Sequence, residues 1–591
     1  MNTSRLNFLS TALSVLFIHL AWARDNAFAQ GWPGYGHDAQ HSCTSGVPSQ
    51  IPQLIRWSTP VDLQPQYSGP GNTGDLYIHY GTPVITAANT LLVPIKTGAT
   101  GGFRVDARKA VDGTLLWSLN TDYAVPSHNW FPICGVTLTP NDAALAVPAA
   151  GGTILLRPSP DSAAGATATR MAFYGIASYN ANPGAYNDAI QICTPITSDA
   201  QGNLYFGYVS SFAGIPSGLA RIASDGTGSF ASAADISGDA SMQKVCYNCC
   251  PALSSDGAKL YVAVNNGSTG YLCVLDSTTL ARQNSVRLLD PKSGSPAWVN
   301  DDSSSTPTVG PDGDVYYGVL ESPSLENNDR GWLLHFSGDL ATTKLPGAFG
   351  WDDTASIVPA SAVPSYSGPS SYLLLTKYNN YADFGIGDGV NRLALNDPST
   401  TYTDPRTGVT VMNPFLTVKG VTPDPDFVNG GFPNAVREWC INSAAVDPIN
   451  HCAVVNSEDG NLYRWDFTKA TDTPGQLTPA LYLAPATGEA YTPTVIGPDG
   501  AVYAINNATL FSVVSVPLLQ AVMDRRNNAL VFGYSRALDN ATYTVQTTID
   551  LVNWTVTGVN QGNGIVGQDV ITSVPIGADT KRFVRLVVTQ P

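Results

Sequence analysis

Short apolar stretches alternate with polar turns along most of the chain, and one unit recurs. Each copy opens with a small or polar residue, often followed by proline, and continues as an apolar strand, a turn and a second strand, as in residues 306–319 (TPTVGPDGDVYYGV). Asp-Gly steps such as Asp312-Gly313 favour the positive φ that a hairpin tip requires. A further hairpin follows each copy, so every unit is expected to hold about four short strands.

The repeat predicts an all-β fold of the propeller type. Copies open near residues 82, 135, 194, 250, 306, 355, 442 and 492. Four-stranded units of this length are typical of propeller blades, so the pattern predicts eight blades, or seven if one weak copy is an insertion. A lone strand at 54–59 is expected to pair into the last blade and close the ring, which removes its free edges. Residues 396–436, rich in Pro, Asp and Gly, are interpreted as an insertion.

Both flanks of the repeat region differ from it. Residues 1–29 combine Arg5, an apolar run and Ala27-Phe28-Ala29, which indicates a secretory signal peptide. A membrane anchor is the alternative, but the run is shorter than the ~20 residues that a spanning helix needs. Residues 516–591 alternate apolar and polar positions with period two, which predicts a small β-sandwich of the fibronectin or immunoglobulin kind. We therefore expect a propeller over 30–515 and a mature protein that is secreted or periplasmic, without a membrane span.

Composition narrows the choice of partners. Only 13% of the 591 residues are charged, the formal net charge is -16, and Gly 55 with Pro 42 fits many turns rather than long helices. An acidic chain argues against nucleic acid as a partner. No Cys-x-x-Cys-His motif occurs, so no c-type haem is expected. Nine cysteines are an odd number, so disulfides formed after export would leave at least one thiol outside an intrachain pair.

Several segments resemble the pyrroloquinoline-quinone-like propeller superfamily, which includes the quinoprotein alcohol dehydrogenases. They are residues 32–38 (WPGYGHD), 103–107 (FRVDA) and 112–117 (DGTLLW). The resemblance implies the propeller fold and, for the enzymes of the family, pyrroloquinoline quinone with calcium as cofactors. It also implies that adjacent cysteines, here Cys249 and Cys250, can form a vicinal disulfide against the quinone. The C-terminal part is similar to modules that end some secreted bacterial proteins.

The segments that precede the first strand of each blade are expected to meet at one mouth of the central channel. Carboxylates gathered there could hold a hard cation or share a proton as an acid/base pair. The candidate catalytic residues are Asp352, Asp353, Arg437 and Glu438. The candidate ligand-binding residues are Cys249, Cys250, Asp301, Asp302, Lys377 and Trp130, with Asp301 and Asp302 as a candidate calcium site. The same mouth is expected to include His128, Asp188, Glu489, Lys96, Glu321, Asn379, Asn380, Asp383 and Glu458.

Three functions follow from this arrangement. The first is a non-enzymatic secreted propeller that binds a small molecule, glycan or protein at its acidic mouth. The second is a quinone- and calcium-dependent alcohol or sugar oxidoreductase, and the third is a hydrolase or lyase at the rim. The simpler alternatives are a solvated acidic rim and cysteines that form ordinary structural disulfides.

Overall fold

A computed structural model gives the architecture of the chain. It describes residues 31–67, 80–99, 101–126, 134–301, 303–477, 481–483, 491–515, 520–524, 529–535, 542–562, 569–575 and 582–589. The predicted signal peptide lies outside the described residues. Within them, no helix is both long enough and apolar enough to cross a membrane.

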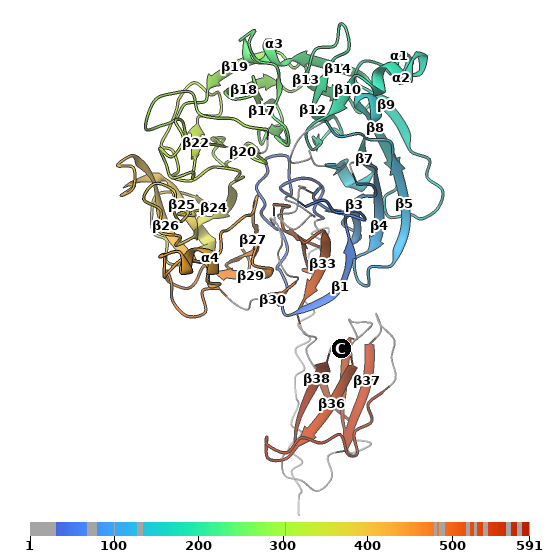
Figure 1. The fold of residues 1–591 in the computed structure, drawn as a ribbon. Helices are drawn as coiled ribbons and strands as arrows, with labels where there is room; N and C mark the ends of the chain where they lie inside the picture. Colours follow the sequence, from blue (N-terminus) through green and yellow to red (C-terminus); the bar gives the residue numbers. More distant parts are fainter. Residues whose placement is uncertain are drawn as a thin grey trace, which may run out of the picture.

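Small antiparallel sheets are arranged around a common centre between residues 54 and 514, as in a β-propeller (Figure 1). The first four sheets in sequence comprise β2 (Val84–Ile85), β3 (Thr90–Lys96), β4 (Phe103–Lys109) and β5 (Leu115–Thr121); β6 (Thr137–Leu138), β7 (Ala144–Ala149), β8 (Thr153–Pro158) and β9 (Thr169–Ala172); β10 (Ile190–Ile192), β11 (Thr197–Ser198), β12 (Leu204–Ser210), β13 (Gly218–Ile222) and β14 (Gly228–Ser232); and β15 (Lys244–Val245), β16 (Ala252–Leu253), β17 (Lys259–Asn265), β18 (Gly270–Asp276) and β19 (Arg282–Arg287).

Four further sheets complete this region. They comprise β20 (Thr308–Val309), β21 (Val315–Val319) and β22 (Trp332–Phe336); β23 (Ser356–Pro359), β24 (Tyr372–Lys377), β25 (Arg392–Thr403) and β26 (Thr410–Lys419); β27 (Ala445–Asp447), β28 (Cys452–Asn456), β29 (Asn461–Asp466) and β30 (Leu481–Tyr482); and β31 (Val495–Ile496), β32 (Val502–Asn506), β33 (Thr509–Val514) and β1 (Leu54–Pro60). The short helices are α1 (Ile176–Ala181), α2 (Pro183–Asn187), α3 (Ala233–Ser237), α4 (Pro425–Asn429) and the 3-10 turns Pro140–Asp142, Ala150–Gly152 and Ala360–Ala362.

The repeat read from the sequence matches these elements closely. Each predicted opening lies one to three residues before a short inner strand, from β2 to β31. The glycines of two predicted Asp-Gly tips, Gly313 and Gly500, have φ of 85° and 78°, which confirms the left-handed turns. Strand β1 pairs antiparallel with β33, from Leu54 opposite Val514 to Pro60 opposite Thr509. A strand from the start of the repeat region thus lies in the same sheet as its last strands.

The prediction that residues 396–436 form an insertion is wrong for the first part of that range. Most of residues 396–419 belongs to β25 and β26, which pair over a long, twisted hairpin as the outer strands of their sheet. Only the segment after Lys419, with α4, leaves the sheet. The Pro-, Asp- and Gly-rich composition reflects bulges in the hairpin, where the register shifts, rather than loss of strand structure.

One edge of the inner strands is covered by residues 32–50, which we call the N-terminal segment. The backbone carbonyls of this segment accept hydrogen bonds from the second residue of most inner strands. The bonds run from the amides of Ile85 to Trp32 (2.9 Å), Leu138 to Pro33 (2.7 Å), Leu253 to Ala39 (2.7 Å), Val309 to Gln40 (2.9 Å), Ile357 to Ser42 (2.9 Å) and Val446 to Cys43 (2.8 Å). An inner edge strand would otherwise present these amides without a partner. The N-terminal segment therefore ties successive sheets together, in sequence order, at the centre of the ring.

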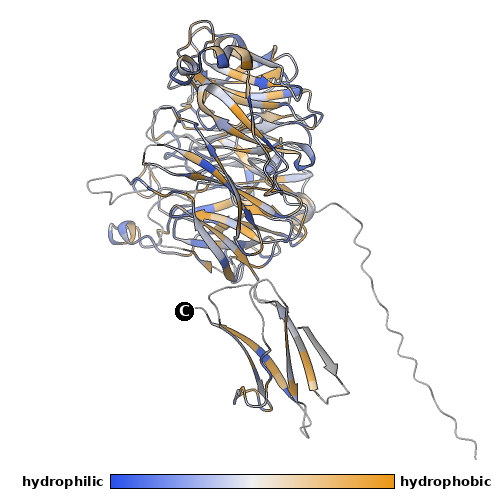
Figure 2. Cartoon of the chain, turned by 90° about the vertical axis from the view of Figure 1, so that its right-hand side faces the viewer, coloured by the Kyte–Doolittle hydropathy of each residue, from blue (hydrophilic) through white to orange (hydrophobic). Residues whose placement is uncertain are grey.

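Hydrophobic positions lie along the strands and pack between neighbouring sheets (Figure 2). The largest buried clusters join residues from consecutive sheets, for example Tyr261 on β17 with Tyr317 on β21. Beyond residue 515 the described strands are β34 (Gln520–Asp524), β35 (Ala529–Ser535), β36 (Thr542–Thr548), β37 (Asp569–Pro575) and β38 (Phe583–Thr589), in a three-stranded sheet of β34, β35 and β37 and a two-stranded sheet of β36 and β38. Val545, Val570 and Val574 form a separate small core there.

Candidate functional site

Two adjacent carboxyl groups lie before β23, at the opening of its sheet. Asp352 accepts hydrogen bonds from the backbone amide and the hydroxyl of Ser304 (2.5 and 2.6 Å), which fixes its carboxylate. Asp353 is 1% exposed, and its Oδ2 has no hydrogen-bond partner. Burial raises the pKa of Asp353 to about 8, although the Lys377 ammonium opposes that rise. Asp353 is therefore largely protonated at neutral pH, and its buried Oδ2 makes no hydrogen bond within the described structure.

Lys377, at the end of β24, links Asp353 with a second acidic group. Its Nζ donates to the carbonyl oxygen of Asp352 (2.7 Å) and lies 5.7 and 5.3 Å from the ring centroids of Phe349 and Tyr491. The same ammonium interacts electrostatically with the carboxyl groups of Asp353 and Glu438. Lys377 is 1% exposed, so these charges act on one another in a poorly hydrated environment.

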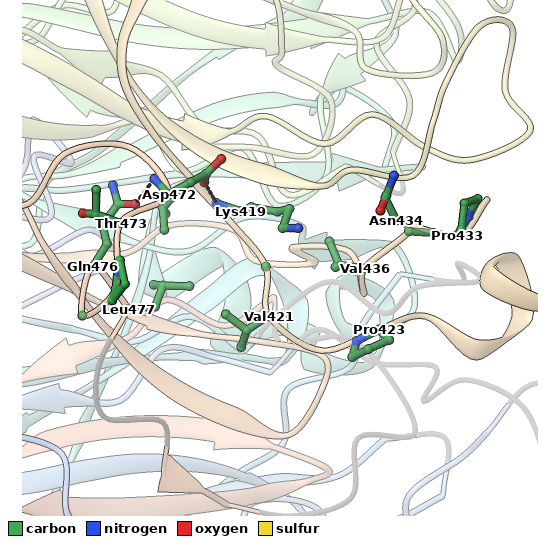
Figure 3. Close-up of a pocket in the computed structure, with 15 residues that line it drawn as sticks. Lys419, Val421, Pro423, Pro433, Asn434, Val436, Asp472, Thr473, Gln476 and Leu477 are labelled. Carbon is green, nitrogen blue, oxygen red and sulfur yellow. Dashed lines mark hydrogen bonds between the residues drawn. The ribbon is translucent and has the colours of Figure 1, made fainter.

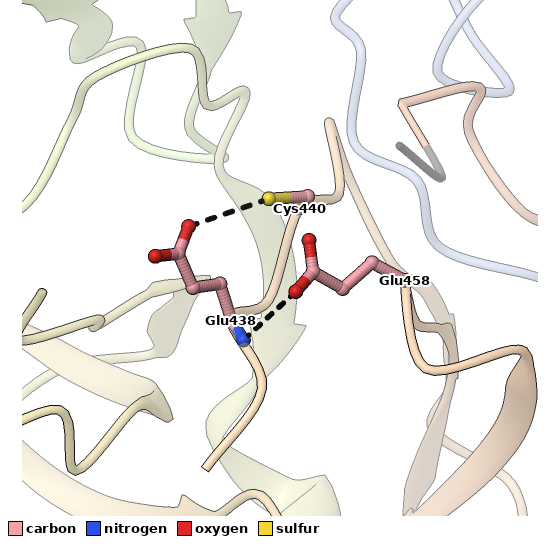
Figure 4. A group of neighbouring side chains, drawn as sticks. All are labelled: Glu438, Cys440 and Glu458. Carbon is pink, nitrogen blue, oxygen red and sulfur yellow. Dashed lines mark hydrogen bonds between the residues drawn. The ribbon is translucent and has the colours of Figure 1, made fainter. Parts of the chain in front are cut away.

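Glu438, Cys440 and Glu458 bring three potential ligand atoms within 4.8 Å of one another (Figure 4). Glu438 and Cys440 precede β27, and Glu458 follows β28. The Cys440 thiol lies 3.7 Å from Glu438 Oε2, and the Glu438 amide donates to Glu458 Oε1 (3.2 Å). Burial, followed by the neighbouring Glu458 carboxylate, raises the pKa of Glu438 to about 8. The pKa of Glu458 is also raised, chiefly by burial.

Tyr35 of the N-terminal segment reaches the same inner strands from the centre of the ring. Its hydroxyl bonds Asn442 Oδ1 and lies 3.3 Å from Thr354 Oγ1. Asn442 in turn donates to Ser304 Oγ (2.8 Å), the hydroxyl that binds Asp352. Tyr35 is 4% exposed, so a buried polar network lies next to the Asp352 carboxyl group.

Asp301 has a different partner from the one predicted. Lys244 Nζ lies 2.5 Å from its Oδ2, and Asn265 Nδ2 donates to its Oδ1 (3.0 Å). This carboxylate is already neutralised by an ammonium group, which removes the reason to place a calcium ion on it. Asp302, with which Asp301 was expected to form that site, lies outside the described residues.

The structure contains no bond between Cys249 and Cys250, the vicinal disulfide that the resemblance allows, and all nine cysteines are free thiols in it. The two side chains also lie in different surroundings. Cys249 belongs to the buried cluster between sheets, whereas Cys250 packs against Tyr35, with its Sγ 3.1 Å from Thr197 Oγ1.

Arg437 does not join the other candidate catalytic residues through any hydrogen bond or ion pair of the described structure. Its guanidinium lies 3.6 Å from Asp424 and 3.9 Å from Asp426, next to α4. A surface pocket lies close by (Figure 3), between segments 418–423, 433–436 and 472–477. The Arg437 guanidinium also acts electrostatically on Glu458, where it opposes the rise in pKa that burial causes.

The other residues predicted for the mouth have different surroundings. Some are buried in local interactions, some are exposed, and some lie outside the described residues. Lys96 forms a buried ion pair with Asp62 (3.0 Å), and Glu321 accepts from the amides of Asp329 (2.5 Å) and Gly331 (2.7 Å) in a local loop. Asp188 and Asp383 are exposed, and Asn379 and Asn380 are buried. Trp130, His128 and Glu489 lie outside the described residues.

Sequence reasoning missed Tyr35, Asn442 and Cys440. Tyr35 was assigned only to a motif of an irregular segment, and nothing local in the sequence indicates that its hydroxyl reaches residues more than 250 positions away. Cys440 could have been found, since it lies two residues after Glu438 in a segment already assigned to the mouth.

The quinone cofactor implied by the resemblance does not fit these residues. Pyrroloquinoline quinone carries three carboxylates, whereas this site already gathers the carboxyl groups of Asp352, Asp353, Glu438 and Glu458 against two cations, Lys377 and Arg437. A flat quinone in the channel would also have to displace the hydrogen-bonded Tyr35. No step of a mechanism is therefore assigned to it.

Comparison with known proteins yields matches only among solved structures. No protein family matches the chain, and no curated protein does. Its fold is similar to that of a quinohemoprotein alcohol dehydrogenase from Comamonas testosteroni (11% identity, TM-score 0.44, covering 85% of this chain and 84% of that one). It is also similar to BamB from Moraxella catarrhalis (11%, TM-score 0.39, 79% and 98%) and Sqt1 from Saccharomyces cerevisiae (9%, TM-score 0.43, 77% and 99%). Identities this low concern the fold and not the activity.

Proposed function

We propose that the chain is a secreted, non-enzymatic β-propeller that binds a positively charged ligand at the acidic mouth of its central channel. The observation that carries the proposal is the buried Asp353, whose Oδ2 has no partner, beside Lys377 and the Glu438–Glu458 pair. Carboxyl groups with a raised pKa hold protons that a cation can replace, because the cation stabilises their ionised form.

The non-catalytic assignment rests on how the four candidate catalytic residues are held. Asp352 is fixed by two hydrogen bonds to Ser304, and Arg437 pairs with Asp424. Asp353 and Glu438 have pKa values raised to about 8, so both are largely protonated at neutral pH. A largely protonated carboxyl is a weak general base but a competent general acid, so these pKa values do not by themselves separate binding from catalysis. Binding is proposed because Asp352 and Arg437 are already held by other residues of the protein.

The simplest ligand of this class is a divalent metal ion at Glu438, Cys440 and Glu458. Two carboxylates and a thiolate suit zinc better than calcium, because calcium prefers oxygen ligands only. Asp353 and Lys377 would then lie beside the ion as a proton donor and a fixed charge.

We also propose that the ring has eight blades and that β1 is its closing strand. Support comes from the eight sheets described between residues 54 and 514 and from the pairing of β1 with β33. Export, which the N-terminal sequence predicts, would place the mouth in contact with extracellular or periplasmic ligands.

Calorimetric titration of the purified protein with Zn²⁺ and with Ca²⁺, at pH 6.5 and pH 8.5, tests the proposal. We expect Zn²⁺ to bind more tightly at pH 8.5, with proton release, because the carboxyl groups near pKa 8 must ionise. Glu438→Gln should weaken binding at least 10-fold. Asp256→Asn, at an exposed turn, is the matched control and should bind as the wild type does.

Loss of binding in both variants, or equal binding at both pH values, would contradict the proposal. Binding of neither ion would leave an organic cation as the ligand, and a titration with spermidine separates that case. Absence of binding by all three would refute a cation site at this mouth.

A further inference from the structure

Cys246 and Cys249 lie at the two ends of one tight turn. The Cys249 amide donates to the Cys246 carbonyl (3.3 Å), and Asn248 between them has φ of 60°. A turn in which the amide of residue i+3 donates to the carbonyl of residue i brings the Cα atoms of these two residues within about 7 Å. Disulfides span Cα separations of roughly 4.4–6.8 Å, so the backbone of this turn is suited to one.

The two thiols also share a neighbour in the next sheet. Both act on the pKa of Tyr317, a residue of β21, so the three side chains lie close together. Both belong to the same buried cluster, at 1% and 0% exposure. Cys250 is excluded from this pair, because its side chain packs on Tyr35 at the channel.

We propose that Cys246 and Cys249 form an intrachain disulfide when the protein folds in an oxidising compartment. A thiolate of one cysteine attacks a small disulfide such as oxidised glutathione, which releases one glutathione thiol and forms a mixed disulfide. The thiolate of the other cysteine then attacks the protein sulfur of that mixed disulfide. The second glutathione leaves as a thiol, so two protein thiols are oxidised and one glutathione disulfide is reduced.

Burial of the two thiols determines at which stage of folding this reaction can occur. Neither thiol is accessible in the folded ring, so the oxidant must reach them before β21 packs over the turn. Once formed, the bond would be protected from reductants by the same packing. It would fix the backbone next to Cys250, whose amide donates to Thr306 Oγ1 (3.1 Å) in the channel wall. The inferred bond thus stabilises one part of the wall of the channel.

A peptide map identifies the pair directly. The protein is refolded in a glutathione redox buffer, denatured in acid, alkylated without reduction and digested with trypsin. Residues 245–259 then form one peptide, between Lys244 and Lys259, that contains Cys246, Cys249 and Cys250. We expect this peptide to lose two hydrogens and to carry a single alkyl group, on Cys250.

Other labelling patterns would overturn the inference. An alkyl group on Cys246 would mean a Cys249–Cys250 bond, one on Cys249 would mean a Cys246–Cys250 bond, and three alkyl groups would mean no bond. A link to a different peptide would equally refute it. The matched variants Cys250→Ser and Cys193→Ser should both retain the two-hydrogen loss, since neither thiol takes part.

Discussion

The N-terminal segment and the group of acidic residues around Lys377 both lie beside β23 and β27, but they differ in how their polar groups are satisfied. The N-terminal segment accepts hydrogen bonds from strand amides through its backbone, and its Trp32 side chain is fully buried. In the acidic group, Asp353 is buried and Glu438 is half-buried, and the pKa of each carboxyl group is raised. The backbone of the first region is satisfied by hydrogen bonds within the protein, whereas Asp353 Oδ2 in the second has no hydrogen-bond partner among the described residues.

The largest effect is expected from the N-terminal segment. Trp32→Ala removes a fully buried indole that packs on β2 and the last sheet, and should lower the free energy of unfolding by about 3–5 kcal/mol. The denaturant midpoint of the purified protein measures this loss. Ile51→Ala, which truncates an apolar side chain that is 45% exposed directly after the segment, is the control and should change the midpoint much less. Equal midpoints for the two variants would mean that the segment does not hold the ring.

Replacement of the buried carboxyl at the mouth should change the dependence of stability on pH. The folded pKa of Asp353 is about 8 and its unfolded pKa is near 4, so the native state binds the extra proton between these values. The wild-type free energy of unfolding should therefore fall as pH rises from 4 to 8, with a contribution on the order of a few kcal/mol. Asp353→Asn should remove most of that fall, so the variant gains stability relative to wild type at pH 8.

Unfolding in urea at pH 5 and at pH 8 checks this expectation. Asp426→Asn changes a carboxyl whose side chain is 81% exposed on α4 and serves as the control. A wild-type protein that becomes more stable between pH 5 and pH 8 through Asp353 would contradict the assignment of a protonated, buried carboxyl.

Removal of the Tyr35 hydroxyl, which links the N-terminal segment to Asn442, should have an intermediate effect on stability. Tyr35→Phe leaves Asn442 Oδ1 without its phenol donor in a buried site, at a cost of about 1–3 kcal/mol. Tyr402→Phe, at a residue 38% exposed, is the matched control. Thermal unfolding of both variants compares them, and an unchanged midpoint for Tyr35→Phe would show that the network beneath the mouth is not needed for stability.

The smallest change is expected from Glu438→Gln in the absence of ligand. Its raised pKa of about 8 gives the same sign as for Asp353, with stability lost as pH rises towards 8. Glu438 is partly exposed, so solvent screening should make its contribution smaller than that of Asp353. Unfolding curves of the single and double variants at pH 5 and pH 8 order the two contributions. A larger effect for Glu438→Gln than for Asp353→Asn would contradict the expectation that the more deeply buried carboxyl group makes the larger contribution to stability.

The local pattern of the sequence predicted the strands, the turns and much of the candidate site. Period-two apolar runs and Asp-Gly tips such as Asp312-Gly313 act over a few residues, so they can be read without the fold. Asp352, Asp353, Lys377 and Glu438 could be assigned to one mouth because repeats place equivalent segments at equivalent points. That reasoning did not indicate that Arg437 pairs with Asp424, because nothing local in the sequence links the two residues.

What the sequence determined by itself is a repeated, locally encoded β-unit with acidic residues at its openings. Only the tertiary structure decided how the N-terminal segment pairs with successive sheets, that Tyr35 lies against Asn442, and that Cys249 and Cys250 have separate surroundings. The physical reason is range, because hydrogen-bond pairing and burial between residues hundreds of positions apart depend on how the sheets assemble around a common centre, and no local pattern encodes which partners that assembly brings together.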